Sequence, residues 1–257
     1  MTYENILSEN KDGICYLRIN RPKQLNALNG ATISELNKAI LSADSDSLVR
    51  CIILTGADNK AFVAGADIKE FAGFDISEGE SLARKGQELL FDLLENIGTP
   101  SIAAINGFAL GGGLELAMSC HIRVASDNAK MGLPEVSLGV IPGYGGTQRL
   151  ANLVGKGKAM ELITTAGMLN AEDAKSWGLV NHVCTLDELI PMAEKIASKI
   201  KRNSPMAISK AIKTVNAGFI DGVNGFEVEK QEFGKCFGTP EFIEGTTAFM
   251  EKRKANF

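Results

Sequence analysis

Hydrophobic positions in the first 185 residues form short runs, separated by segments with helical spacing. The runs are four to six residues long and contain mostly β-branched or other apolar residues. Several end at turn residues such as Thr55-Gly56 and Asn106-Gly107, which is typical of buried strands. The five predicted strands are residues 14–19, 49–54, 101–105, 122–125 and 179–183.

Helical spacing predicts three helices between these runs. The first is marked by Ile33, Leu36, Ile40 and Leu41. The second is long and ends before Pro100, and its apolar positions are Leu82, Leu89, Leu90, Leu93, Leu94 and Ile97. The third, from Leu114 to Cys120, follows a run of glycines. Strands that alternate with helices predict an α/β core whose sheet faces are both covered.

The C-terminal third has a different pattern, because from Leu186 to Phe257 the apolar spacing is almost entirely helical. Ser204-Pro205 and Thr239-Pro240 place proline in the first turn of a helix, where its missing N–H is tolerated. We therefore expect residues 1–185 to form the core, and residues 186–257 to form a helical appendage rather than an independent domain.

Composition narrows the class of protein. Hydrophobic residues make up 45% of the chain and charged residues 23%, which is ordinary for a globular protein with a sizeable core. The net charge of −4 argues against a nucleic-acid footprint over the whole surface. The start lacks a signal-peptide pattern, and no apolar run is long enough to cross a bilayer. The odd number of scattered cysteines predicts free thiols and a cytoplasmic location.

Three successive glycines stand directly before Leu114-Glu115, and they predict the start of a helix rather than its middle. The first turn of a helix has N–H groups without intrahelical partners, and glycine lets a ligand approach them. Gly112 and Glu115 are three residues apart and lie on one helix face, so an N–H and a carboxylate could address one reacting group. The structural alternative is tight strand–helix packing with a solvated glutamate in the first turn.

A second carboxylate, Glu135, follows Leu133-Pro134, and the glycine-rich stretch 141–147 comes soon after it. Earlier in the chain, Ala64, Gly65 and Ala66 have side chains small enough for their backbone N–H groups to face a ligand. Taken alone, each segment also fits an ordinary loop. Two carboxylates among several glycine-rich stretches favour acid–base chemistry beside a carbonyl group.

Other kinds of site find no support in the sequence. His121 and His182 are the only histidines and have no metal-ligand spacing, so we expect no metal site and structural roles for both. The Gly-x-Ser-x-Gly, Gly-x-Gly-x-x-Gly and Walker A patterns are absent. The basic run 252–254 is typical of a solvated helix end, with contact to a phosphate as the alternative.

Six stretches resemble signature sequences of the crotonase (enoyl-CoA hydratase) superfamily, in the same order. They are 20–27 (NRPKQLNA), 62–69 (FVAGADIK), 106–117 (NGFALGGGLELA), 133–135 (LPE), 141–150 (IPGYGGTQRL) and 249–254 (FMEKRK). The resemblance covers essentially the whole chain. It implies a ββα superhelix in residues 1–185, a C-terminal helical trimerisation region in residues 186–257, and assembly as a homohexamer, a dimer of trimers.

The resemblance also implies a role for each matching residue. The N–H groups of Ala66 and Gly112 would form an oxyanion hole for a thioester oxygen, and Glu115 and Glu135 would be the catalytic pair. The path of the coenzyme A moiety would be lined by Leu25, Ala27, Ala64, Asp67 and Ile68. Its phosphates would meet Lys23, Lys69 and, across a subunit boundary, Lys252.

The activity implied is reversible syn hydration of short-chain trans-2-enoyl-CoA, such as crotonyl-CoA to 3-hydroxybutyryl-CoA. No separate cofactor is expected, because coenzyme A is part of the substrate, and neither a nucleic acid nor a membrane is expected as a partner. A 3,2-enoyl-CoA isomerase of the same family is the alternative enzyme. An RNA-binding protein on the same scaffold is the alternative from another class, and the negative net charge disfavours it.

Overall fold

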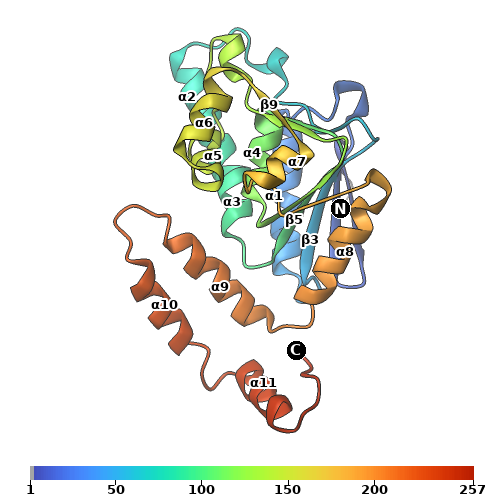
Figure 1. The fold of residues 1–257 in the computed structure, drawn as a ribbon, viewed down its shortest axis with the longest axis vertical. Helices are drawn as coiled ribbons and strands as arrows, with labels where there is room; N and C mark the ends of the chain where they lie inside the picture. The colour runs from blue at the N-terminus through green and yellow to red at the C-terminus, as the bar shows by residue number, and fades with distance from the viewer. Residues whose placement is uncertain (1–2) are drawn as a thin grey trace.

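A computed structural model describes residues 3–257, and its strands form two sheets (Figure 1). Neighbouring strands of the larger sheet are parallel, except that β1 and β2 are antiparallel. Their order is β1 (Ile6–Lys11), β2 (Ile14–Ile19), β3 (Cys51–Gly56), β5 (Ser101–Ile105), β7 (Ile122–Ser126) and β10 (His182–Cys184).

The smaller sheet is built from three-residue strands, and all but the last of them follow a strand of the larger sheet in the chain. Its order is β4 (Ala61–Val63), β6 (Phe108–Leu110), β8 (Lys130–Gly132) and β9 (Met168–Asn170). Three times the chain runs from the larger sheet into the smaller one and then into a helix. These repeated β–β–α units confirm the expected superhelix.

Side chains of the larger sheet alternate between two apolar clusters, one on each face, because successive residues of a strand point to opposite sides. Leu17 and Leu54 belong to the cluster on one face, and Ile14 and Ile53 to the cluster on the other. This second cluster is completed by α8 (Leu189–Ile200), which packs against the sheet. Both faces are buried, which is why these strands appear as continuous apolar runs in the sequence.

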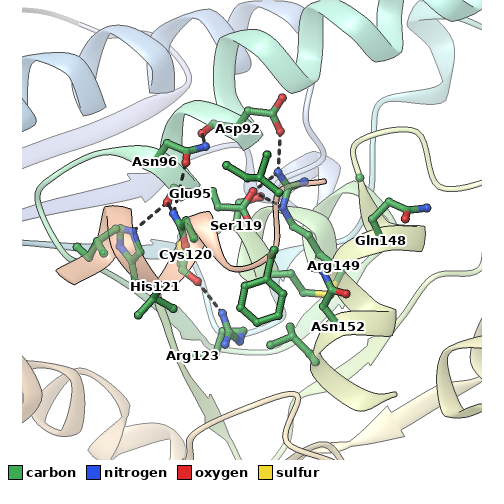
Figure 2. A pocket seen from close by; sticks show the side chains of 18 of the residues that line it. Asp92, Glu95, Asn96, Ser119, Cys120, His121, Arg123, Gln148, Arg149 and Asn152 are labelled. Atoms are coloured by element: carbon green, nitrogen blue, oxygen red, sulfur yellow. Dashed lines mark hydrogen bonds and ion pairs between the residues drawn. The ribbon is translucent and has the colours of Figure 1, made fainter. Parts of the chain in front are cut away.

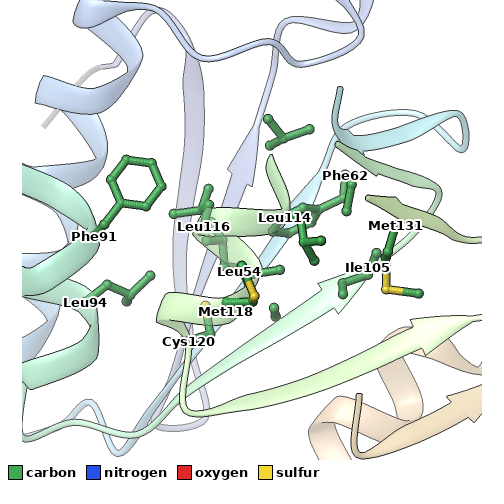
Figure 3. Close-up of a cluster of buried hydrophobic side chains, with 14 of the residues drawn as sticks. Leu54, Phe62, Phe91, Leu94, Ile105, Leu114, Leu116, Met118, Cys120 and Met131 are labelled. Carbon is green, nitrogen blue, oxygen red and sulfur yellow. The ribbon is translucent and has the colours of Figure 1, made fainter. Parts of the chain in front are cut away.

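Helices cover the first face, with α4 (Gly112–Ser119) at their centre, and all eight of its residues are buried. Figure 3 shows Leu114, Leu116 and Met118 of this helix among other core side chains. The remaining helices of this part are α1 (Gly30–Ser45), α2 (Ile76–Gly86), α3 (Asp92–Asn96), α5 (Gly146–Val154), α6 (Lys156–Thr164) and α7 (Ala171–Ser176). Short turns of other helical types are η1 (Pro22–Gln24), η2 (Ile68–Glu70), η3 (Gln87–Phe91), η4 (Glu135–Leu138) and η5 (Leu186–Glu188).

Three further helices, α9 (Pro205–Ala217), α10 (Gly225–Gly234) and α11 (Pro240–Met250), extend away from the sheets (Figure 1). Pro205 and Pro240 begin α9 and α11, as expected, and Ser204 and Thr239 cap these helices. The division at residue 185 stays a prediction, because α8 packs on the sheet whereas α9–α11 do not.

The predicted elements agree with the structure where the apolar pattern is long enough. Residues 14–19 and 101–105 are strands within the predicted bounds, and β3 begins two residues later than the run 49–54. The run 179–183 overlaps β10 only in its last two residues. The smaller sheet escaped prediction, because three residues carry no recognisable period. All five cysteines are free, which confirms that expectation.

The absence of a side chain at Gly113 allows α4 to pack closely on β4, and a substitution tests this packing. A methyl group on Gly113 would lie 2.0 Å from the Val63 carbonyl oxygen. Gly113→Ala should therefore lower the free energy of unfolding by about 1–3 kcal/mol. Gly157→Ala is the matched control in α6, since a methyl group there meets nothing within 4 Å. Urea unfolding checks both variants, and a Gly113→Ala protein as stable as the parent would contradict this packing.

Candidate active site

One cavity of about 380 Å³ brings together the segments that the sequence singled out. It lies between the loop before η2, the start of α4, η4 and the loop that leads into α5. One part of its wall combines small residues, which are polar only through their backbone, with three polar side chains. The small residues are Ala64, Gly65, Ala66, Gly111 and Gly112, and the polar side chains are Glu115, Glu135 and Tyr144. Its apolar wall includes Ile68, Phe71, Phe74, Leu82, Leu138 and Ile141. A cavity with an apolar wall and a few convergent polar groups is typical of a small-molecule site.

Glu115 lies in the first turn of α4 and is only 1% exposed. Its Oε1 atom accepts hydrogen bonds from the Tyr144 N–H at 2.8 Å and the Gly146 N–H at 2.7 Å. Burial raises the pKa of this carboxyl to about 7, and the nearby Glu135 acts in the same direction, whereas the two N–H donors and Arg149 oppose the shift. A pKa in this range suits a group that exchanges a proton near neutral pH.

Glu135 reaches the same cavity from η4. Among the buried side-chain nitrogen and oxygen atoms of residues 3–257, its Oε2 is the one without a hydrogen-bond partner. Burial raises the pKa of this carboxyl as well. Gly111 makes room for it, since a methyl group there would lie 2.9 Å from Glu135 Oε1. An unpaired buried oxygen at a cavity wall is a position where a bound water or substrate would supply the missing hydrogen bond.

The N–H groups of Ala66 and Gly112 also meet at this cavity. Gly112 is the first residue of α4, so its N–H has no partner within the helix. The chain around Ala66 bridges to Leu28 through Gly65 O and the Asp67 N–H, which directs the Ala66 N–H to the opposite side. A methyl group on Gly112 would lie 3.7 Å from the Ala66 nitrogen. Residues 66 and 112 are therefore neighbours at the cavity wall, as a shared oxyanion site requires.

Of the residues expected along the coenzyme A path, some line the cavity and others lie beside it. Ala64 and Ile68 line the cavity, and the Ala64 N–H donates to Leu25 O at 3.0 Å, which holds Leu25 beside it. Asp67 forms an ion pair with Arg21 at 3.0 Å, and Arg21 also donates to Ala27 O. Arg21, for which no role was expected, thus ties together two of the expected segments.

The expected phosphate contacts stay predictions. Lys23 and Lys69 are exposed and do not line the cavity. Lys252 follows α11, at the opposite end of the molecule from α2, which lines the cavity (Figure 1). It could reach a site only in another copy of the chain, which agrees with the expected contact across a subunit boundary.

A larger cavity of about 770 Å³ lies between α9 and helices α3–α5, and none of the expected residues lines it (Figure 2). His121 faces it, with Nδ1 accepting from the Ser101 N–H at 3.0 Å and Nε2 at 3.2 Å from Glu95 O. Burial lowers the pKa of His121, which favours the neutral form of this side chain, and its structural role stays a prediction. The described part of the chain has no cluster of three or more potential metal ligands, and none of its helices is long and apolar enough to span a membrane.

Residues 9–257 match the protein family described as enoyl-CoA hydratase/isomerase, and the chain belongs to this family. It is 46% identical to a crotonyl-CoA hydratase of Syntrophomonas wolfei, over 100% of this chain and 99% of that one. It is 47% identical to a short-chain-enoyl-CoA hydratase of Clostridium acetobutylicum, over 99% and 97%. The crystal structure of an enoyl-CoA hydratase from Bacillus anthracis superposes with a TM-score of 0.91, at 39% identity and 99% coverage of both chains.

The raised pKa of Glu115 predicts how stability depends on pH. The folded state holds a proton up to about pH 7, whereas the unfolded carboxyl releases it near 4.5, so stability falls as pH rises between these values. Glu115→Gln should remove part of this fall, on the order of 1–3 kcal/mol. Urea unfolding of both proteins between pH 4.5 and 8 measures it. Parallel curves for the two proteins would show that Glu115 is not protonated on folding.

Proposed function

We propose that this chain is an enoyl-CoA hydratase, which adds water reversibly across the double bond of short-chain trans-2-enoyl-CoA. The conversion of crotonyl-CoA to 3-hydroxybutyryl-CoA is the reaction we assign. One observation carries the proposal: the buried carboxyl of Glu115 and the half-buried carboxyl of Glu135 line the same cavity as the backbone of Ala66 and Gly112. The names of the two relatives above support the choice of a short-chain substrate.

In the hydration direction, water bound between Glu115 and Glu135 attacks C3 of the enoyl group. One O–H bond of the water breaks and its proton goes to a carboxylate, while a new bond joins oxygen to C3. A proton from the carboxyl pair is delivered to C2, so the enzyme ends with the number of protons it began with. Addition from one side of the double bond follows, because both carboxyls face the same cavity.

Negative charge collects on the thioester oxygen as the water adds. The N–H groups of Ala66 and Gly112 stabilise this charge, and one such donor contributes on the order of 10²- to 10³-fold in rate. General acid–base catalysis adds on the order of 10²- to 10⁴-fold. The pKa of about 7 at Glu115 suits this work, because it allows a proton to move in either direction near neutral pH.

The coenzyme A moiety lies, in this proposal, along the exposed segments beside the cavity mouth. Leu25 and Ile68 are exposed apolar side chains there, and Ala27, Ala64 and Asp67 flank them. Lys23 and Lys69 supply positive charge for phosphate groups. Coenzyme A is thus part of the substrate, and the acid–base chemistry comes from the chain itself.

We further propose that the chain assembles as a homohexamer, a dimer of trimers, through its C-terminal helices. These helices and the turns between them leave many large apolar side chains exposed in the single chain: Val215, Phe219, Ile220, Phe226, Phe233, Phe237, Ile243, Phe249 and Met250. Exposed apolar surface on this scale is typical of a subunit interface. Assembly would also bring Lys252 to a neighbouring site.

Changing Glu115 or Glu135 to Gln tests the catalytic pair. Each variant should lower kcat for crotonyl-CoA hydration by about 10²- to 10⁴-fold, because the amide neither accepts nor donates the transferred proton. Binding of the CoA ester should persist. The loss of conjugated-enoyl absorbance measures turnover.

Glu172→Gln is the matched control, since Glu172 is exposed in the first turn of α7. It should retain the parent rate, and near-parent turnover in either Glu115→Gln or Glu135→Gln would end the paired-carboxyl proposal. A protein that instead raises the absorbance with a 3-enoyl-CoA, and adds no water, would be an isomerase. A panel of enoyl-CoA esters of increasing length tests the short-chain assignment.

The assembly proposal predicts a mass in solution about six times the 27.4 kDa of one chain, measured by light scattering after size exclusion. Phe249→Asp places a charge on an exposed apolar position of α11 and should yield smaller species. Leu48→Asp is the control, because Leu48 is equally exposed but lies outside the C-terminal helices. A hexamer that survives Phe249→Asp, or a monomeric parent, would contradict this interface.

A further inference from the structure

We infer that Arg149 is a positioning residue for the Glu115 carboxyl: its guanidinium fixes the loop 143–146, whose N–H groups hold Glu115 Oε1. The inference rests on the proposed function, since it assumes that Glu115 moves a proton. Arg149 lies in the family-like stretch 141–150 but was given no role there, and its side chain does not line the smaller cavity. It acts, in this account, through the backbone of Tyr144 and Gly145.

The guanidinium of Arg149 joins α3 to this loop. Its side chain is 9% exposed and forms ion pairs with Asp92 at 2.7 Å and Glu95 at 2.6 Å, both on α3 (Figure 2). Its Nη1 donates to Tyr144 O at 2.9 Å. The planar guanidinium spreads its donors over three nitrogens and can bind all three partners at once, whereas the donors of lysine all lie on one nitrogen.

The same loop residues hold Glu115. Tyr144 accepts from Arg149 through its carbonyl oxygen and donates to Glu115 Oε1 through its N–H. Gly145, between the two N–H donors, has φ of +91°, and a methyl group there would lie 2.1 Å from Arg149 Nη1. The guanidinium is thus packed directly on the peptide that separates the two donors. A shift of Arg149 would move both of them.

A second contact holds the loop from the other side. In the π-helical turn η3, Gln87 Nε2 donates to Gly143 O at 2.7 Å, and Phe91 stacks on the Tyr144 ring at 4.6 Å. These contacts act on the Gly143 carbonyl and on the Tyr144 side chain. The Arg149 side chain instead binds the Tyr144 carbonyl, which lies between the two donors, so the arginine and the helix have separable effects.

A purely stabilising role does not explain an arginine at this position. A positive charge in the first turn of a helix opposes the helix dipole, and a buried ion pair gives little net stability compared with apolar packing. The carboxylates of Asp92 and Glu95 are partly exposed and would be solvated without Arg149. Stability alone thus does not account for this arginine. Its position does, because there its geometry and its charge both act on Glu115.

The charge of Arg149 reaches Glu115 as well. The charged groups that bear on Glu115 are Glu135 from η4, which raises its pKa, and Arg149 from α5, which lowers it. Tyr144 has a pKa of about 12 and stays neutral at working pH. Removing Arg149 takes away the favourable charge and loosens the two N–H bonds to Glu115 Oε1. Both changes raise the pKa of Glu115.

The experiment compares Arg149→Met, which removes charge and geometry, with Arg149→Lys, which keeps the charge. Both should lower kcat for crotonyl-CoA on the order of 10- to 100-fold with little change in KM, because misplacement of a catalytic group acts mainly on the chemical step. Infrared spectroscopy of the protonated carboxyl band, assigned by its absence in Glu115→Gln, measures the titration of Glu115 without activity. Arg149→Met should move the midpoint of the Glu115 titration to higher pH, and Arg149→Lys should move this midpoint less.

Arg123→Met is the matched control. Arg123 is also buried, but it donates to Leu179 O at 2.8 Å and Cys120 O at 2.6 Å, away from the loop. It should lose stability and keep the Glu115 midpoint. If Arg149→Met does not fold, Arg149→Lys carries the same test, with a lower kcat and a smaller shift of the Glu115 titration midpoint.

An unchanged midpoint and kcat in Arg149→Met would overturn the positioning role, as would an equal shift of the midpoint in Arg123→Met. Failure of the proposed function looks different. In that case Glu115→Gln itself would retain turnover, while the infrared midpoint would still show whether Arg149 acts on the carboxyl.

Discussion

The carboxyl of Glu115 is buried in the core at the start of α4, and the rest of the site is arranged around that burial. A buried carboxylate is costly unless it is hydrogen-bonded or protonated. Here two backbone N–H groups bind one of its oxygens, and the surroundings raise its pKa to about 7. The same group is thus held in place and able to exchange a proton.

The fold meets this requirement by close backbone packing. Repeated β–β–α units place the start of α4 against β4, where Gly113 lies too close to the Val63 carbonyl for any side chain. Gly111 leaves space for Glu135, and Gly145 leaves space for the Arg149 guanidinium. Glycines at these positions therefore serve one purpose, which is to let carboxyls, amides and a guanidinium converge within a small volume.

Prediction from the sequence succeeded where the physical signal is local. Buried parallel strands such as 101–105 are apolar on both faces, so the run itself reveals them. Gly112 and Glu115 share a helix face because of their spacing, and their place at the cavity agrees with that expectation. Local signal failed for the three-residue strands of the smaller sheet. It also failed for Arg21 and Arg149, whose partners lie up to 57 residues away in the chain.

The sequence by itself determined the class of fold, the family resemblance and the segments in which chemistry would be found, because glycine runs, proline positions and apolar periods act over a few residues. The tertiary structure alone decided which atoms meet: that Glu115 and Glu135 share a cavity, that the Tyr144 and Gly146 N–H groups hold one oxygen, and that a guanidinium supports their loop. Burial and hydrogen bonding between distant segments set the protonation of a carboxyl, and neither exists before the chain is folded.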